Sequence, residues 1–490
     1  MIKLLNTLTG QKEEFSPIKG KKVGIFVCGP TVYDWSHIGH ARTYIIFDII
    51  VKYLRYKGYK VDFVMNITDI DDKIIDQAKE KGKSWKETAE FYEEAFMEDI
   101  KNLGIDSVDK FVRATEHIPE IIKQIKTLIE KGYTYQNNDG IYFDISKFQD
   151  YGKLAKRTAE QAEDAVSRID ESVKKKNKGD FVLWRFSEAG QPSWDLESGL
   201  ENKIGSTQSQ YRPGAGRPGW HIEDTAITEK YLGQQYDIHC GAQDLIFPHH
   251  EAEIAQQESA SGKKPFVKYW LHSGFVTLNG RKMSKSLKNF ITIKEILKEY
   301  QPEAMRFMVL SVHYRSPIDY KEDLIKQSEA AVQRIGELMK KLELIGKSGP
   351  KEKKIEMNEI IKNAKLEFEA KMNDDFNTPE ALAVLFNFIR AINNSISEDS
   401  LDKKSVVQIS KFLEEINRIF GILPQKEFGI PEEIFELVQK REDSRKQKDW
   451  LEADKIRGKI QNSGYLVEDT AYGPLVRPVK SAKGGAALWH

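Results

Sequence analysis

A strand, a helix and a second strand follow one another near the N-terminus, and this order limits the possible folds. Residues 22–28 (KVGIFVC) form a short β-branched and aromatic run, which Gly29-Pro30 closes. A helical pattern covers about residues 37–56, and residues 60–67 (KVDFVMNI) are a second strand candidate. Strand, helix and strand in this order indicate a βαβ unit, and therefore a parallel sheet covered by helices. We predict an α/β fold with a doubly wound parallel sheet.

The chain of 490 residues is too long for one core, and its pattern changes along its length. Strand signals return at residues 220–222 and 236–240, which indicates that an insertion splits the sheet domain. From residue 322 onward, nearly uninterrupted heptad-like helix indicates a bundle. The predicted order is the first half of the sheet domain at 1–115, an inserted segment at 116–200, the second half at 201–321, a helical bundle at 322–429, a small module at 430–475 and a tail at 476–490.

Composition narrows the class of protein. Lys and Arg number 75 and so do Asp and Glu, so the net charge of zero argues against a purely electrostatic nucleic-acid coat. Only two cysteines occur, Cys28 and Cys240, which argues against a disulfide scaffold. The apolar stretches are too short to span a bilayer, and the first residues lack the apolar core of a secretion signal. We expect a cytoplasmic enzyme that does not bind membranes.

A histidine-glycine motif follows the first strand at the predicted start of the helix. A helix N-terminus at the carboxyl end of a parallel strand favours phosphate, because free backbone N–H groups and the helix dipole both attract anions. Gly39 lets the backbone approach a ligand closely, and His37 and His40 lie three residues apart, so that both imidazoles can reach the same phosphates. The motif predicts a site for a nucleotide phosphate.

A second motif, KMSKS at residues 282–286, lies in a loop after the strand candidate at 274–278. Lys282 and Lys285 are three residues apart on this loop, where both can reach a triphosphate and neutralise the charge that builds on leaving pyrophosphate. A lysine–serine loop alone is more often a solvated turn. Together with the histidine motif about 240 residues earlier, it is a specific signal.

The two motifs, HIGH and KMSKS, resemble those of the class I aminoacyl-tRNA synthetases, and in detail those of the cysteinyl-tRNA synthetase family. The resemblance covers nearly the whole chain. It is carried by CGPTVYDWSHIGHAR (28–42), NITDIDDKI (66–74), GRPGWHIED (216–224), DIHCGAQDLIFPHHEAEIAQ (237–256), KMSKSLKNF (282–290), HYRSPIDY (313–320), MNDDFNTPEA (372–381) and ADKIR followed by EDTAYG (453–473).

The resemblance implies a Rossmann-type catalytic domain with an insertion, a stem-contacting region, an anticodon-binding helical bundle and a small C-terminal module. It also implies an ATP-dependent ligase. Such an enzyme converts L-cysteine and ATP, which brings Mg²⁺, into cysteinyl-adenylate and pyrophosphate. It then transfers cysteine to the 3′-terminal adenosine of tRNA(Cys). Members of the family are usually monomers.

The family binds one zinc ion through two cysteines, a histidine and a glutamate, and three of these positions match Cys28, His249 and Glu253. His249 and Glu253 are four residues apart and therefore share a helix face. The fourth position is Asp224, where the family has cysteine, while Cys240 stands where the family usually has glycine. Either residue can complete the site. We expect Cys240, because zinc prefers nitrogen and sulfur ligands and the ends of neighbouring strands lie close together.

Zinc would give a direct way to distinguish cysteine from serine, because a metal-bound thiol loses its proton far more readily than a hydroxyl does. Discrimination by shape alone gives only about 10–200-fold for such small differences. The resemblance places His37 and His40 on the phosphates and Lys285, aided by Lys282, on the pyrophosphate.

The remaining expected contacts serve the other substrates. Gly241 and Asp244 are expected at the adenosine, and Thr68 and Trp220 at the amino-acid pocket. In the C-terminal third, Trp450 and Tyr472 are candidates to stack on anticodon bases.

Two other functions are open to this sequence. An enzyme that passes cysteine to a small amine, as in mycothiol synthesis, shares the catalytic half, but residues 322–475 argue against it. A catalytically silent RNA-binding relative is disfavoured by the intact motifs. Cysteine-dependent ATP–pyrophosphate exchange and transfer to tRNA separate the three.

Overall fold

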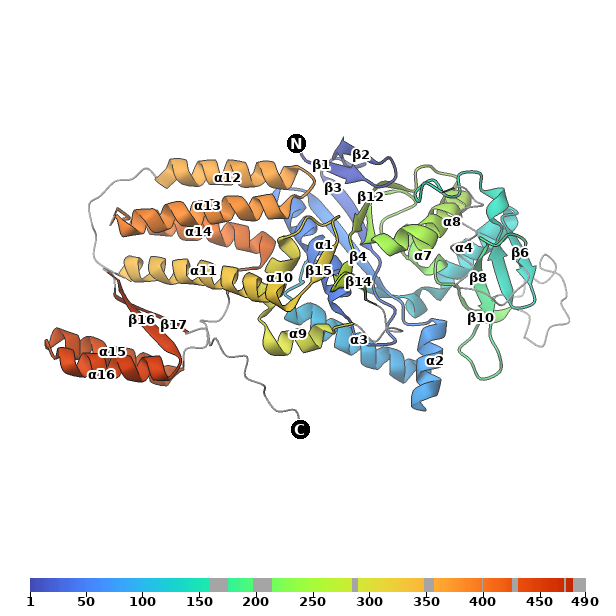
Figure 1. Cartoon of the computed structure of the whole chain (residues 1–490). Coiled ribbons are helices and arrows are strands. Elements are labelled where there is room, and N and C mark those ends of the chain that lie inside the picture. The colour runs from blue at the N-terminus through green and yellow to red at the C-terminus, as the bar shows by residue number, and fades with distance from the viewer. Residues whose placement is uncertain are drawn as a thin grey trace. The chain divides into compact units, whose positions relative to one another are not determined.

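The computed structural model describes residues 1–157, 175–196, 214–283, 290–347, 357–398, 400–424, 431–470 and 473–478 (Figure 1). The chain falls into two units. Residues 1–325 with 370–380 form the first, and residues 326–369 with 381–490 form the second. The boundaries expected from the sequence place residues 370–380 within the helical bundle and not with the first unit. Those boundaries remain predictions.

A five-stranded parallel sheet forms the centre of the first unit, in the order β12-β11-β3-β4-β5. Its strands are β3 (Lys22–Val27), β4 (Lys60–Ile67), β5 (Lys110–Arg113), β11 (Tyr236–Ala242) and β12 (Val267–Ser273). The first of them in the chain, β3, lies in the middle, so the connections leave it in both directions. This is the doubly wound arrangement, in which ligands bind outside the carboxyl ends of the strands. The predicted α/β fold is confirmed.

Helix α1 (Ile38–Tyr56) is the crossover from β3 to β4 and is buried along most of its length. Residues 44–51 (YIIFDIIV) are all buried, because the helix packs on the parallel sheet and on α10 (Pro302–Leu310). The buried Asp48 carboxylate pairs with the Arg306 guanidinium at 2.8 Å, which offsets the cost of burying either charge. Packing of this kind fixes the helix whose first turn lies at the carboxyl end of β3.

An antiparallel sheet is inserted between β5 and β11, in the order β6-β7-β8-β10-β9. Its strands are β6 (Thr134–Asn137), β7 (Gly140–Phe143), β8 (Phe181–Phe186), β9 (Trp194–Asp195) and β10 (Ala215–Pro218). Helices α4 (Ile118–Glu130), α7 (Ile222–Tyr231) and α8 (Glu251–Ser261) pack together beside it (Figure 1). A Cβ at Gly216 would lie 2.2 Å from the Arg185 carbonyl oxygen, so β8 and β10 approach this closely only because of the glycine.

Residues 220–222 do not form the predicted strand. Strand β10 ends at Pro218, the chain turns through Trp220, and α7 begins at Ile222. The apolar residues Ile222, Ala226 and Ile227 recur at helical spacing, and all three are buried. These apolar residues therefore form the buried face of a helix and not a strand.

A small three-stranded sheet, in the order β14-β13-β15, leads into the KMSKS motif. Its strands are β13 (Val276–Leu278), β14 (Arg281–Lys282) and β15 (Ile318–Tyr320), and α9 (Ile293–Glu299) follows the motif. The described part of the first unit also contains β1 (Lys3–Asn6), β2 (Gln11–Glu14), α2 (Asp72–Lys81) and α3 (Trp85–Asn102). Residues 284–289, which include Lys285, lie outside the described residues.

The second unit is largely helical, as predicted. Helices α11 (Glu322–Lys347), α12 (Met357–Asn373), α13 (Thr378–Ser397) and α14 (Lys403–Phe420) lie side by side (Figure 1). Helices α15 (Glu432–Lys446) and α16 (Trp450–Asn462) pack on each other next to the hairpin of β16 (Tyr465–Thr470) and β17 (Gly473–Pro478), around Val438, Ile456 and Val467. None of the helices in the described parts of the chain combines the length and apolar content needed to cross a membrane.

Candidate active site and metal centre

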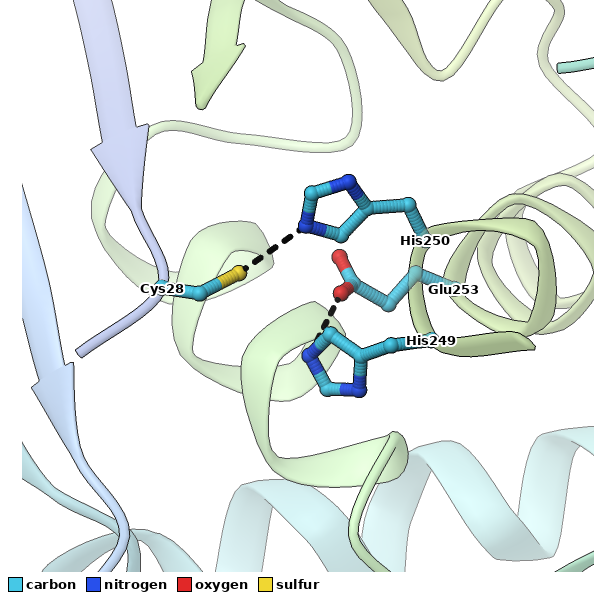
Figure 2. A group of neighbouring side chains, drawn as sticks. All are labelled: Cys28, His249, His250 and Glu253. Carbon is cyan, nitrogen blue, oxygen red and sulfur yellow. Dashed lines mark hydrogen bonds and ion pairs between the residues drawn. The ribbon is translucent and has the colours of Figure 1, made fainter. Parts of the chain in front are cut away.

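A cluster of potential metal ligands lies at the carboxyl end of β3. The ligand atoms of Cys28, His249, His250 and Glu253 all lie within 4.8 Å of one another, and all four residues are buried. Cys28 directly follows β3, whereas the other three come from the π-helical turn Ile246–His250 and the start of α8. Figure 2 shows the thiol and the other three side chains converging from these two sides. Three of the four residues were predicted from the sequence to bind a metal.

The donor set of this cluster fits a cation. The Cys28 Sγ atom is 3.2 Å from His250 Nε2, and His249 Nε2 is 3.0 Å from Glu253 Oε1 (Figure 2). Among the described residues, neither buried oxygen of Glu253 has a hydrogen-bond donor in suitable geometry. A buried carboxylate without such a donor is costly unless a charge of opposite sign lies nearby. A thiol, two imidazoles and a carboxylate are the ligand types that zinc prefers.

Asp224 also lies at this cluster. Its Oδ2 is 2.9 Å from His249 Nε2, and its Oδ1 accepts a hydrogen bond from the Asn66 amide at 2.7 Å. The side chains of Asp224 and His249 are both fully buried. The Asp224 carboxylate therefore occupies a fixed position beside a predicted metal ligand.

The structure does not place Cys240 among these groups. Residue pairing sets Cys240 of β11 opposite Val27 of β3, so the backbones are indeed neighbours, as expected. Successive side chains along a strand point to opposite faces, however, and the adjacent His239 directs its Nε2 to within 3.3 Å of Cys28 Sγ. The Cys240 thiol consequently lies on the other face of the sheet. The site of this chain combines Cys28, His249 and Glu253 with Asp224 and His250.

Electrostatics at the cluster favours a bound cation. Burial raises the pKa of the Cys28 thiol well above its usual range, and the carboxylates of Asp224 and Glu253 raise it further. Burial alone would lower the pKa of His249, but Glu253 and Asp224 raise it to about 10. Burial likewise raises the pKa of Glu253. Each shift reflects negative charge that water does not solvate, and a divalent cation at the centre would stabilise the thiolate and the carboxylates together.

Buried histidines behind the cluster orient its ligands. His250 Nδ1 is 2.8 Å from His272 Nε2, and His272 Nδ1 is 2.8 Å from Thr7 Oγ1. His239 Nδ1 is 2.6 Å from the Tyr236 hydroxyl. A hydrogen bond to the ring nitrogen that does not bind the metal fixes the orientation of a metal-binding histidine.

Cys28 and His249 of the cluster, together with Asp224, line a cavity of about 350 Å³. The Trp220 indole stacks on the His249 imidazole, with ring centroids 4.3 Å apart, and covers the cluster on that side. The cavity brings together most of the residues that the sequence predicted for the site: Cys28, His37, Gly39, His40, Thr68, Trp220, Asp244 and His249. Residues of a potential metal site and residues of a helix N-terminus therefore line the same cavity.

The histidine motif, whose residues line the same cavity, has a precise local geometry. His37 caps α1, and its Nδ1 accepts a hydrogen bond from the Gly39 amide at 3.1 Å. His40 Nδ1 accepts one from the His37 amide at 3.2 Å, and the two rings stack with centroids 4.0 Å apart. A Cβ at Gly39 would lie 2.8 Å from the His37 ring, so only glycine leaves the two rings in place. The two imidazoles thus form a fixed pair at the first turn of the helix.

Three predicted site residues are placed differently or remain undescribed. Gly241 does not line the cavity. A Cβ there would lie 2.8 Å from the His250 ring, so this glycine makes room for the His250 side chain of the cluster of potential metal ligands. Lys282 ends β14 and Lys285 lies outside the described residues, while Met283 between them lines the cavity.

Comparison with known proteins decides the family. The family described as the tRNA synthetases class I (C) catalytic domain matches residues 14–330, and the DALR domain family matches residues 367–424. A cysteine–tRNA ligase of Thermodesulfovibrio yellowstonii is 45% identical over 96% of this chain and 98% of its own length. Another, of Thermococcus onnurineus, is 43% identical over 97% of this chain and 98% of its own length. The chain belongs to the cysteine–tRNA ligase family.

Solved structures show the same fold at low sequence identity. The Mycobacterium tuberculosis methionyl-tRNA synthetase in complex with methionyl-adenylate has a TM-score of 0.61 at 17% identity, covering 82% of this chain and 92% of that one. For this member of the cysteine–tRNA ligase family, the Rossmann-type fold inferred from the resemblance is therefore confirmed.

The sequence did not single out His250, His239 or His272, although all three lie at or next to the cluster of this cysteine–tRNA ligase family member. The doubled histidine of FPHHE was the available signal for His250. The Ile246–His250 turn contains a non-helical residue, Phe247 (φ −140°, ψ 131°), so the segment does not follow ordinary helical spacing. His239 and His272 sit within strands and carry no motif of their own.

Proposed function

We propose that the chain ligates L-cysteine to tRNA(Cys) in two steps, the first of which consumes ATP. In the first, a cysteine carboxylate oxygen bonds to the α-phosphorus of ATP, and the bond to the leaving pyrophosphate breaks. In the second, a ribose hydroxyl oxygen of the terminal adenosine bonds to the carbonyl carbon of the adenylate. The bond to AMP breaks, and the hydroxyl proton leaves with AMP or to solvent. The observation that carries the proposal is the cavity shared by the metal cluster and the His37–His40 pair.

We further propose that zinc is the ion of the cluster, held by Cys28, His249, Glu253 and Asp224. Asp224, Cys28 and His249 line the cavity, whereas His250 lies behind them against His272. When bound, zinc would supply a Lewis acid that selects a thiolate over a hydroxyl. His249 is held in position by Glu253 and by the Trp220 indole, and Asp224 is held by the Asn66 amide.

The remaining residues bind and orient the other substrate, ATP. The backbone of Gly39 and the imidazoles of His37 and His40 lie at the α1 N-terminus, where phosphate charge is stabilised. Lys285, with Lys282, would neutralise the pyrophosphate, and Asp244 would accept hydrogen bonds from the adenosine ribose. Mg²⁺ would arrive with ATP. Positioning and charge neutralisation suffice for phosphoryl transfer, so no protein nucleophile is required.

The second unit is proposed to bind the tRNA anticodon region. Trp450 at the start of α16 is 57% exposed, and the Arg445 guanidinium lies 5.6 Å from its ring centroid. An exposed indole beside a cation suits an unpaired base next to a phosphate. Tyr472, the other expected aromatic, lies outside the described residues. We propose that the enzyme acts as a monomer in the cytoplasm.

The direct test is cysteine-dependent ATP–pyrophosphate exchange, followed by charging of a tRNA(Cys) transcript. Exchange and charging together would support the proposal. Exchange without charging would support a ligase for a different acceptor, and the absence of exchange in a folded, zinc-loaded protein would contradict the proposal. A tRNA(Ser) transcript is the matched control for the acceptor.

A further inference from the structure

Asp375 is a buried carboxylate that the reaction described above does not use. It lies in the turn between α12 and α13, within the segment 370–380 that belongs to the first unit, and it is 1% exposed. Its backbone has φ of 61° and that of Phe376 has φ of 51°, a left-handed pair without glycine. Two such residues in succession are costly and persist only where the surroundings determine them.

The carboxylate of Asp375 gathers donors from two distant segments of the chain. Its Oδ1 accepts hydrogen bonds from the Leu5 amide at 2.8 Å and from the Tyr314 hydroxyl at 2.9 Å. Its Oδ2 accepts from Arg315 Nε at 2.7 Å and lies 2.6 Å from Arg315 Nη2. Two guanidinium nitrogens thus converge on Oδ2 and two further donors on Oδ1, so both oxygens of the buried carboxylate are held, Oδ2 by charge-assisted contacts.

The partners Tyr314 and Arg315 belong to a loop, residues 313–316, that lies directly behind the wall of the cavity. The Tyr314 carbonyl accepts the Gly274 amide at 2.8 Å, and Gly274 lines the cavity. A Cβ at Gly274 would lie 2.7 Å from the Arg315 carbonyl oxygen and 2.5 Å from that of Ser316, so wall and loop are in close backbone contact. Any displacement of the loop would be passed directly to this wall.

The same loop is joined to both elements expected to hold ATP. The Arg42 guanidinium, on the helix that carries the histidine motif, donates to the carbonyls of Tyr314, at 3.2 Å, and of Ser316. The Gln243 amide, next to Asp244, donates to the Arg315 carbonyl at 3.2 Å. The loop thus joins the helix that carries the histidine motif to the segment next to Asp244, whereas none of its hydrogen bonds or ion pairs among the described residues reaches Cys28, His249 or Glu253.

We propose that Asp375 is a positioning residue for ATP: by holding Tyr314 and Arg315, it fixes the loop that aligns the Gly274 wall, the α1 N-terminus and the Asp244 turn around the nucleotide. This inference rests on the proposed function and adds a residue to its ATP site. Asp375 touches no substrate. Its effect is on ATP and not on cysteine, because the metal end of the cavity is built from other residues.

The test compares Asp375→Asn with Asp374→Asn in the full chain. Asp374 is the adjacent residue, and its carboxylate pairs with Lys12 at 2.6 Å on the surface, where it is 55% exposed. In cysteine-dependent exchange, Asp375→Asn is expected to raise the KM for ATP about tenfold or more, since small misplacements of reacting groups are costly. The KM for cysteine and the bound zinc should stay within twofold of the wild type, and Asp374→Asn should behave as the wild type.

Two milder variants keep the proposal testable where Asp375→Asn does not fold. Tyr314→Phe removes one donor, and Arg315→Lys keeps the charge but replaces two nitrogens that contact Oδ2 with one. Each is expected to raise the KM for ATP about threefold, again without a change for cysteine. Equal changes in both KM values, or a loss of active enzyme with unchanged KM values, would overturn the proposal as a merely structural effect. A wild type without exchange would instead overturn the proposed function.

Discussion

The Asp224 carboxylate lies against the His249 imidazole, with Oδ2 2.9 Å from Nε2, and the two side chains come from different helices. Asp224 stands where the cysteine–tRNA ligase family is expected to have a cysteine. Its place beside His249 supports the proposal that a carboxylate takes over the role of that thiolate. The metal centre can therefore be tested one ligand at a time.

Removal of Asp224 should reduce zinc binding. We expect Asp224→Ala to weaken zinc affinity at least about 100-fold, because a ligand is lost and His249 loses its partner. Asp224→Cys should retain zinc, since thiolate is a preferred ligand. Zinc content after dialysis, measured by mass spectrometry, checks both. Cys240→Ala is the matched control and should keep full zinc. Loss of zinc in Cys240→Ala, with retention in Asp224→Ala, would restore Cys240 as the ligand.

Gly39→Ala should impair activation of cysteine without unfolding the protein. The added Cβ would lie 2.8 Å from the His37 ring and would displace it from its stack on His40. We expect kcat/KM for ATP–pyrophosphate exchange to fall about 100-fold. Gly346→Ala is the matched control within helix α11, because its Cβ would meet only a Val406 methyl at 3.8 Å. Equal activities of the two variants would argue against a role for the histidine pair.

Asp99 on α3 should make stability depend on pH. Burial raises the pKa of its carboxyl to about 7, above its value in the unfolded chain of about 4. Folding therefore favours the protonated form, so stability falls as pH rises from about 4 to 7 and stays lower above that range. Asp99→Asn should remove this loss and raise the free energy of unfolding at pH 8 by about 2 kcal/mol, roughly half of the full effect of the shift because solvent screens part of the charge, with little change at pH 4.

Denaturant unfolding at pH 4 and pH 8 measures this effect. Glu94→Gln, an exposed carboxylate of the same helix, is the control and should leave the difference between the two pH values unchanged. An Asp99→Asn variant that is destabilised at pH 8 would mean that the buried carboxylate is needed in its charged form.

Trp450 should matter for tRNA and not for adenylate formation. Base stacking on an aromatic side chain contributes about 1–3 kcal/mol, so Trp450→Ala should raise the KM for tRNA(Cys) between about five- and 150-fold. Exchange without tRNA should be unchanged. Leu451→Ala, its neighbour with 77% exposure, is the control. A normal KM for tRNA in Trp450→Ala would place the anticodon elsewhere.

Local patterns predicted much of the fold. The βαβ pattern of residues 22–67 gave the parallel sheet, because strands that alternate with a buried helix have few other solutions. The set of Cys28, His249 and Glu253 came instead from the resemblance to the cysteinyl-tRNA synthetase family, and the structure brings these three side chains together.

Local patterns did not predict which way some side chains point, or which distant segments of the chain come into contact. The adjacency of β3 and β11 was expected, but which face of β11 points toward Cys28 depends on register, and this placed His239 instead of Cys240 at the site. The π-helical turn that brings His250 to the cluster leaves no periodic signature. The docking of Asp375 on the loop at 313–316 joins residues about 60 positions apart, which no local pattern records.

A metal ion beside the nucleotide cavity is proposed to select a thiol over a hydroxyl. This selection can be measured by ATP–pyrophosphate exchange with cysteine and with serine, on one preparation stripped of zinc and then resupplied with it. The stripped, folded protein should lose exchange with cysteine, zinc should restore it, and serine should stay inactive throughout. Full cysteine-dependent exchange without the ion, still with no response to serine, would mean that the ion does not select the substrate.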